Sequence, residues 1–281
     1  MRYVSCLRGG RPIAALVDGD RLLPLRGVSE LGPNTPIELL SDPPVDRAGA
    51  FALGEASLRP VIPNPRKIVC VGLNYRSHLE ETGRSGSDYP VLFAKFATSL
   101  VGPYEPIVLP PESTSIDYEA EIAVVIGRMA RRAEKSSALD HVAGYTIAND
   151  VSMRDYQNKT HQWLPGKSWD QSTPIGPALV TPDEAPPPED MRLKLEYNGQ
   201  TLQDATADLM IFPVDELIST ISTFTTLLPG DVILTGTPGG VGMRRTPPVW
   251  LRPGGRVRVS VTGLGQLDNP LIADDVESST P

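Results

Sequence analysis

The chain has 281 residues, of which 40% are hydrophobic and 21% are charged, as in ordinary globular proteins. Its net charge of −8, from 26 basic and 34 acidic residues, argues against nucleic acid as a partner. No apolar run approaches the roughly 20 residues that a membrane-spanning helix needs, so we expect no membrane partner either.

The cellular compartment can be predicted from two features. The first residues of the chain lack the apolar stretch of a signal peptide. Cys6 and Cys70 are its only cysteines, and two free thiols are typical of a reducing compartment. We therefore expect a cytoplasmic protein.

The N-terminal part predicts a small β-rich domain over residues 1–62. Residues 11–25 contain two apolar stretches around Asp18-Gly19, which is typical of a β-hairpin. A short helix is expected at residues 37–40. The two prolines within residues 61–66 interrupt regular structure and predict a linker.

We expect the main domain over residues 63–275 and a frayed polar tail over residues 276–281. With 29 prolines and 25 glycines the chain favours short strands and loops over long helices. We expect a hairpin around Asn198-Gly199, helices over residues 151–159 and 214–224, and strands over residues 67–72, 92–96, 116–125, 143–149, 231–235 and 257–261.

Three acidic residues form the first candidate site. Side chains two apart in a strand point to the same face, so Glu119 and Glu121 can converge. Asp150 follows another predicted strand and could add a third oxygen, a set that suits Mg²⁺ or Mn²⁺. The alternative is that the two glutamates line the solvent face of an edge strand and that Asp150 caps the next helix.

A histidine and an acid form the second candidate site. His78 and Glu81 are three residues apart, so on a helix they share a face and can form a hydrogen bond. Such a pair could act as a general base. Gly83 and Gly86 suggest a mobile lid beside it, although a plain exposed histidine would have the same sequence.

Other residues could contact a substrate. Arg154 and Gln157 lie at i+4 and i+7 from Asp150 on the predicted helix, and Thr237 lies in a glycine-rich loop after a strand. Lys167 is by itself consistent with a surface lysine. Pocket-shaping and packing roles are equally open for Tyr75, Phe93, Lys95, Gln162 and Trp163.

Six motifs in chain order together resemble the fumarylacetoacetate hydrolase family. They are VGLNYRSH at residues 71–78, DYEAE at 117–121, GYTIANDVSMRDYQ at 144–157, GKSWD at 166–170, PIGP at 174–177 and PGDVILTGTPGGV at 229–241. The resemblance implies an α+β, mainly β fold: a mixed-sheet roll or sandwich with a small N-terminal domain, usually as a homodimer.

The resemblance also implies roles for the residues named above. It implies Mg²⁺ or Mn²⁺ at Glu119, Glu121 and Asp150, and a His78–Glu81 dyad on a lid. Asn74 stands where some relatives have a further aspartate, so we expect three carboxylates. The remaining matched positions imply substrate binding or charge stabilisation: Tyr75, Arg154, Gln157, Lys167 and Thr237.

The leading hypothesis is a metal-dependent hydrolase that cleaves a carbon–carbon bond in an acylpyruvate-like keto acid. His78, oriented by Glu81, would deprotonate the attacking water, and Lys167 would stabilise the oxyanion. The same site could decarboxylate oxaloacetate-like acids or isomerise 2-hydroxy-dienoates. A non-enzymatic alternative is a binding or scaffold protein that keeps the metal site.

Overall fold

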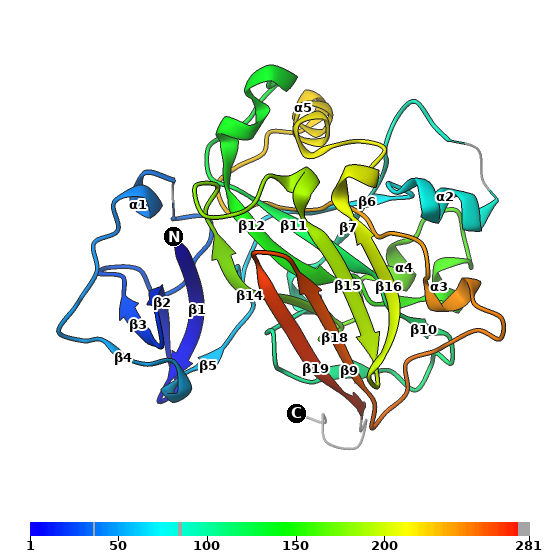
Figure 1. Cartoon of the computed structure of the whole chain (residues 1–281), viewed down its shortest axis with the longest axis horizontal. Coiled ribbons are helices and arrows are strands. Elements are labelled where there is room, and N and C mark those ends of the chain that lie inside the picture. The colour runs from blue at the N-terminus through cyan, green and yellow to red at the C-terminus, as the bar shows by residue number, and fades with distance from the viewer. Residues whose placement is uncertain (36, 84–85, 275–281) are drawn as a thin grey trace.

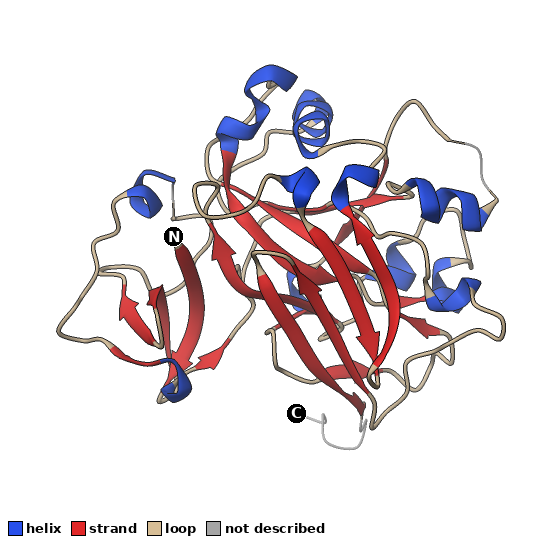
Figure 2. Ribbon diagram, viewed as in Figure 1, coloured by secondary structure: helices blue, strands red, loops and turns tan. Residues whose placement is uncertain are grey.

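The computed structural model describes residues 1–35, 37–83 and 86–274. These residues form a mainly β structure with short helices at its periphery (Figure 2). The expected α+β, mainly β class is confirmed. The predicted tail, residues 276–281, lies outside the described residues, as do residues 84 and 85 of the predicted lid.

Within the described ranges, the largest sheet has 12 strands. Two of them branch off its main path: β5 (Ser57–Leu58) pairs with β1, and β8 (Leu100–Val101) pairs with β14. The main path runs, in spatial order, through β4 (Phe51–Ala52), β3 (Arg21–Pro24), β2 (Arg11–Asp18), β1 (Arg2–Arg8), β14 (Thr173–Val180), β12 (Val142–Asn149), β11 (Ala120–Ile126), β17 (Val232–Leu234), β6 (Ile68–Gly72) and β7 (Val91–Lys95).

A second sheet packs over the centre of the first (Figure 1). Its strands, in spatial order, are β16 (Gln200–Thr206), β15 (Arg192–Tyr197), β18 (Arg256–Val261), β19 (Gly265–Ala273) and β9 (Ile107–Leu109). The apolar core between the sheets includes Ile122, Val124, Leu193 and Val259, all of them buried. This two-layer arrangement is the expected mixed-sheet sandwich.

The central strand β11 is buried on both faces. Ile122 and Val124 face the second sheet, whereas Ala123 and Val125 belong to a second core cluster with Leu31 and other N-terminal residues. The alternative that Glu119 and Glu121 line the solvent face of an edge strand is therefore wrong. β11 lies between β12 and β17, and every one of its residues is buried.

The two predicted hairpins are present. Asp18 pairs with Arg21 across the β2–β3 turn, and Tyr197 pairs with Gln200 across the β15–β16 turn. Asn198 and Gly199 have φ values of 50° and 81°, the left-handed conformation that a two-residue hairpin turn requires.

The helices are short. α5 (Val214–Phe224) matches the predicted helix, with Leu217, Ile218 and Ile221 buried against the core. α1 (Ile37–Ser41) forms where a short helix is expected. The other helical segments are α2 (Arg76–Thr82), α3 (Arg154–Gln157), α4 (Leu164–Lys167) and the 3₁₀ segments η1 (Leu53–Glu55), η2 (Ala97–Ser99), η3 (Lys135–His141), η4 (Pro188–Asp190), η5 (Ala207–Leu209) and η6 (Gly242–Arg244).

Two predicted elements differ from the structure. The strand expected over residues 116–125 is divided into β10 (Ile116–Asp117) and β11. The helix expected over residues 151–159 is wrong in its first part, because β13 (Ser152–Met153) pairs with β10 and keeps the chain extended. α3 begins only at Arg154, so Asp150 is not its N-cap.

The N-terminal strands belong to the same sheet as the rest of the chain. β1 pairs antiparallel with β14, with Arg2 opposite Val180 and Tyr3 opposite Leu179. A domain boundary at residue 62 stays a prediction. Cys6 and Cys70 are buried free thiols, as expected. Of the helices in the described ranges, none combines the length and apolar composition that a membrane crossing requires.

Candidate active site

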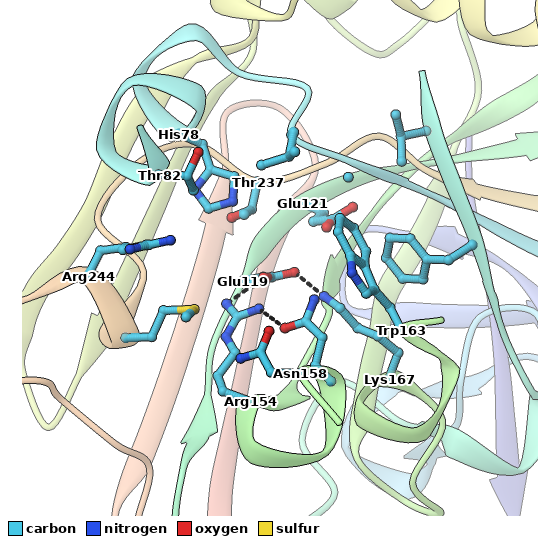
Figure 3. A pocket seen from close by; sticks show the side chains of 16 residues that line it. His78, Thr82, Glu119, Glu121, Arg154, Asn158, Trp163, Lys167, Thr237 and Arg244 are labelled. Carbon is cyan, nitrogen blue, oxygen red and sulfur yellow. Dashed lines mark hydrogen bonds and ion pairs between the residues drawn. The ribbon is translucent and has the colours of Figure 1, made fainter. Parts of the chain in front are cut away.

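A small polar cavity of about 70 Å³ lies where the ends of β6 and β11 meet α2, α3, α4 and η6 (Figure 3). Most of the site residues expected from the sequence line it: His78, Glu119, Glu121, Arg154, Gln157, Lys167 and Thr237. Segments far apart in the chain therefore build one pocket.

The three predicted metal ligands converge beneath this pocket. Glu119, Glu121 and Asp150 are buried, and each offers a carboxylate oxygen within 4.8 Å of the others. The pairing of β11 with β12 explains the convergence: Ala120 lies opposite Asn149, and the backbone N–H of Asp150 donates to the Glu119 carbonyl at 2.9 Å.

Two cations neutralise Glu119. Nη2 of Arg154 donates to Oε1 of Glu119 at 2.6 Å, and Nζ of Lys167 donates to Oε2 at 2.6 Å. Burial alone would raise the pKa of this carboxyl group, but Arg154 and Lys167 outweigh burial and hold the pKa below its ordinary value. Glu119 is therefore ionised at neutral pH.

Asp150 also has two cationic partners. Nζ of Lys95 donates to its Oδ1 at 2.6 Å, and Nζ of Lys167 donates to its Oδ2 at 2.8 Å. The Lys95 and Asp150 side chains are fully buried. These two lysines occupy both oxygens of the carboxylate, which explains why Asp150 does not cap a helix.

Glu121 lacks a cationic partner among the described residues. Its Oε2 accepts a hydrogen bond from the Gly236 N–H at 2.7 Å. Burial, Asp150 and Glu119 all raise its pKa well above the ordinary value. Buried carboxylates thus outnumber buried cations here: Asp117, Glu119, Glu121 and Asp150 face Lys95, Arg154 and Lys167.

This donor set fits a hard divalent cation. All three converging ligands are carboxylate oxygens, which select Mg²⁺ or Mn²⁺ over softer metals. A cation would also stabilise the ionised form of Glu121, whose pKa burial and the neighbouring carboxylates Asp150 and Glu119 raise in spite of the hydrogen bond from Gly236. The residues present therefore match a divalent-metal site, and the identity of the ion is left to experiment.

The raised pKa of Glu121 predicts a pH dependence of metal binding. The raised pKa favours the protonated carboxyl group in the metal-free site, so a cation competes with a proton for it. We therefore expect Mn²⁺ affinity to rise as the pH is raised, and protons to be released on binding. Calorimetric titration in two buffers of different ionisation enthalpy measures this release. A Glu121→Gln variant should bind Mn²⁺ weakly, and a wild-type affinity independent of pH would contradict the prediction.

The predicted proton-transfer pair is formed. Nδ1 of His78 lies 2.6 Å from Oε1 of Glu81 on α2. Oε2 of Glu81 accepts a hydrogen bond from the Gly240 N–H at 2.8 Å, and Oγ of Ser77 accepts one from the Gly239 N–H at 3.0 Å. The glycine-rich loop after β17 thus fixes both the helix and the carboxylate that orients His78.

The remaining predicted residues lie in different environments. Gln157 accepts a hydrogen bond from Nη1 of Arg154 at 2.8 Å, and Thr237 accepts one from Nε2 of Gln203 at 2.8 Å. Tyr75 is fully buried, does not line the pocket, and its hydroxyl group has no hydrogen-bond partner within the described ranges. Its predicted substrate contact stays a prediction.

Sequence reasoning missed two residues that organise the site. Asp117 is fully buried and accepts a hydrogen bond from Nε of Arg154 at 2.8 Å, which orients that guanidinium group. Lys95 was considered only as a pocket-shaping residue, yet it neutralises Asp150. The one sequence indication for Lys95 is a lysine at the end of an otherwise apolar strand.

The two-layer β fold therefore carries a buried carboxylate cluster of the metal-binding type beside a hydrogen-bonded histidine–glutamate pair. The sequence profile "Fumarylacetoacetate (FAA) hydrolase C-terminal" matches residues 67–272. The chain belongs to the fumarylacetoacetate hydrolase family, as the six motifs suggested.

Curated relatives bear the names of isomerising enzymes. The chain is 45% identical, over 213 residues, to "Oxaloacetate tautomerase FAHD2A, mitochondrial" of Bos taurus; the match covers 75% of this chain and 68% of the relative. It is 46% identical to "Oxaloacetate tautomerase fahd2, mitochondrial" of Xenopus laevis, over 77% of this chain and 68% of that protein. These relatives are mitochondrial by name, so the cytoplasmic location stays a prediction.

Solved structures share the whole fold. A 5-carboxymethyl-2-hydroxymuconate delta-isomerase from Mycobacterium smegmatis has 32% identity and a TM-score of 0.83, over 98% of this chain and 100% of that one. A 2-hydroxyhepta-2,4-diene-1,7-dioate isomerase from Mycobacterium marinum has 33% identity and a TM-score of 0.82, over 98% and 99%.

Proposed function

We propose that this protein is a divalent-metal-dependent isomerase that interconverts the keto and enol forms of oxaloacetate or a similar 2-oxo dicarboxylic acid. The observation that carries the proposal is the position of His78. Its ring lines the same pocket as Glu119 and Glu121, and Glu81 holds its Nδ1 at 2.6 Å. One oriented base beside a metal-type site meets the needs of a proton transfer between carbon and oxygen.

The metal ion and the side chains have separate roles in this reaction. A cation held by Glu119, Glu121 and Asp150 would polarise the keto oxygen and acidify the adjacent C–H bond. The hydrogen bond to Glu81 assigns the Nδ1 proton of His78, so Nε2 is the atom that accepts the proton from C3 of the keto form.

The proton balance then closes with solvent. As Nε2 of His78 takes the C3 proton, the keto oxygen gains a proton from solvent and the enol forms; the imidazolium of His78 then releases its proton to solvent, which restores the neutral base. In the reverse direction Nε2, protonated by solvent, gives this proton to C3 while the enol O–H proton leaves to solvent. Glu81 stabilises the imidazolium ion between these steps, and the Gly240 N–H keeps Glu81 in place.

Hydrolysis of an acylpyruvate, which the sequence first favoured, needs in addition an attacking water and a free oxyanion donor. Lys167 is the predicted donor, and in the structure two of the three N–H donors of its Nζ bind Glu119 and Asp150. Hydrolysis therefore stays a prediction that ranks behind isomerisation. Decarboxylation, which needs no attacking water, also stays a prediction, and one experiment measures all three.

The experiment compares products. The protein, loaded with Mg²⁺ or Mn²⁺, is incubated with oxaloacetate and with acetylpyruvate; the enol absorbance is followed, and pyruvate, acetate and carbon dioxide are quantified. We expect faster keto–enol equilibration of oxaloacetate without stoichiometric pyruvate. Cleavage of acetylpyruvate with the higher kcat/KM would establish the hydrolase, carbon dioxide release would establish the decarboxylase, and no reaction at all would favour the scaffold alternative.

A further inference from the structure

Among the described residues, one cation that lines the pocket has no acidic partner. Lys167 binds Glu119 and Asp150, and Arg154 binds Asp117 and Glu119. Arg244, which also lines the pocket, is exposed, and its side chain has no hydrogen-bond or ion-pair partner in the part of the chain that the structure describes. Its charge is available to a ligand.

Arg244 lies across the pocket from Lys167, the lysine that binds the acidic cluster. Figure 3 shows Arg244 on the side of the pocket where His78 lies, across from Lys167 and Trp163, with its guanidinium group directed toward the interior. A ligand that reaches the acidic cluster with one end therefore presents its other end to Arg244.

The backbone that carries Arg244 is held firmly. Both carboxylate oxygens of Asp117 accept backbone hydrogen bonds from η6, one from Gly242 at 2.7 Å and one from Met243 at 3.1 Å. A Cβ atom at Gly242 would lie 2.0 Å from the carbonyl oxygen of Val249 and 2.6 Å from Oδ1 of Asp117. Only glycine allows this close approach, so the loop is packed directly onto a buried acid.

Arg245, the next residue in the chain, forms hydrogen bonds within the protein. Nε of Arg245 donates to the Tyr118 hydroxyl group at 3.0 Å and to the Gly240 carbonyl at 3.1 Å, and its Nη2 donates to the Leu202 carbonyl. Arg245 therefore fixes the loop from its other end. Between two anchored neighbours, Arg244 directs its guanidinium group into the pocket from a backbone that is fixed in place.

From this geometry we infer that Arg244 is a specificity-determining residue that binds the distal carboxylate of a dicarboxylic substrate. The inference rests on the proposed function, because it assigns the second carboxylate of an oxaloacetate-like acid. A planar guanidinium group binds a carboxylate through two parallel hydrogen bonds, which a lysine cannot reproduce. A 2-oxo acid without that carboxylate, such as pyruvate, gains nothing from Arg244.

The test compares a pair of ligands that differ by this carboxylate. An Arg244→Met variant should raise the KM for oxaloacetate by about 10- to 100-fold, with little change in kcat. The Kd of the Mn²⁺-loaded protein for pyruvate, measured by calorimetry, should stay as in the wild type. An Arg244→Lys variant should recover only part of the lost affinity. The control is Arg26→Met, at an exposed arginine in the turn after β3, which should behave as wild type.

The outcomes separate the two proposals. If the wild type isomerises oxaloacetate and Arg244→Met leaves its KM unchanged, the role of Arg244 is wrong and the proposed function stands. If the wild type does not isomerise oxaloacetate, the Kd values of the unreactive diacid malonate and of pyruvate still decide. A selective loss of malonate binding in Arg244→Met supports the inference, and an equal loss for both ligands overturns it.

Discussion

Replacing His78 by glutamine is expected to lower the kcat for oxaloacetate tautomerisation by about 10²–10⁴-fold, the usual contribution of a general base. Glutamine can still donate a hydrogen bond to Glu81, so the helix should keep its position, but its amide cannot accept a proton. The measurement is the initial rate of enol disappearance for the Mg²⁺-loaded variant and the wild type at equal concentration.

Two controls separate lost chemistry from lost binding. His78 is not one of the converging carboxylates, so His78→Gln should bind Mn²⁺ with wild-type affinity. His161 is exposed and does not line the pocket, so His161→Gln should keep full activity. A His78→Gln variant that turns over at the wild-type rate would show that another group moves the proton.

Replacing Lys95 by methionine should destabilise the fold by about 3–5 kcal/mol, the cost of breaking a buried ion pair from one side. Both side chains of the Lys95–Asp150 pair are fully buried, with Nζ 2.6 Å from Oδ1. Methionine nearly preserves the volume, so the loss arises from a buried carboxylate that keeps only Lys167 as a cationic partner, rather than from a cavity. Urea unfolding of the metal-free protein measures the difference as a shift in midpoint.

Two further variants test the cause of this effect. The Lys95→Met, Asp150→Asn double variant removes both charges and should regain much of the lost stability. Lys135→Met breaks an exposed pair with Glu216, in which the side chains are 51% and 38% accessible, and should change little. Equal midpoints for Lys95→Met and the wild type would mean that the buried pair contributes no net stability.

The sequence indicated the fold through local patterns and through the resemblance. The hairpin around Asn198-Gly199 and the amphipathic helix α5 both follow from short-range chemistry, namely a left-handed turn and apolar residues at helical spacing. Spacing alone left the roles of the site residues open, and the resemblance carried by the six motifs assigned them. Their convergence depends on the pairing of β11 with β12, which brings Glu119 next to Asp150.

The errors arose where distant partners override local preference. Asp150 followed by residues 151–159 has the pattern of a capped helix, but lysines 55 and 17 residues away in sequence take both of its carboxylate oxygens. Pairing with β10 then keeps Ser152 and Met153 extended. Neither partner can be identified from propensity within the segment.

The role of Lys95 could not be derived from its own neighbourhood either. A lysine that ends a short strand is usually solvated, and only the packing of β7 beside β6 and α4 encloses it. The division of residues 116–125 into β10 and β11 likewise depends on β13, which contributes a partner to one half only. These features are tertiary in origin.

The pairing of β1 with β14 has a consequence for how the protein is made. Residues 2–3 pair with residues 179–180, so β1 cannot complete this edge until the chain has been synthesised as far as residue 180. Until then its unpaired backbone groups are open to wrong associations. We therefore expect assembly to be slow, since contacts so remote in sequence close late, and nascent chains halted before residue 173 should be caught by chaperones.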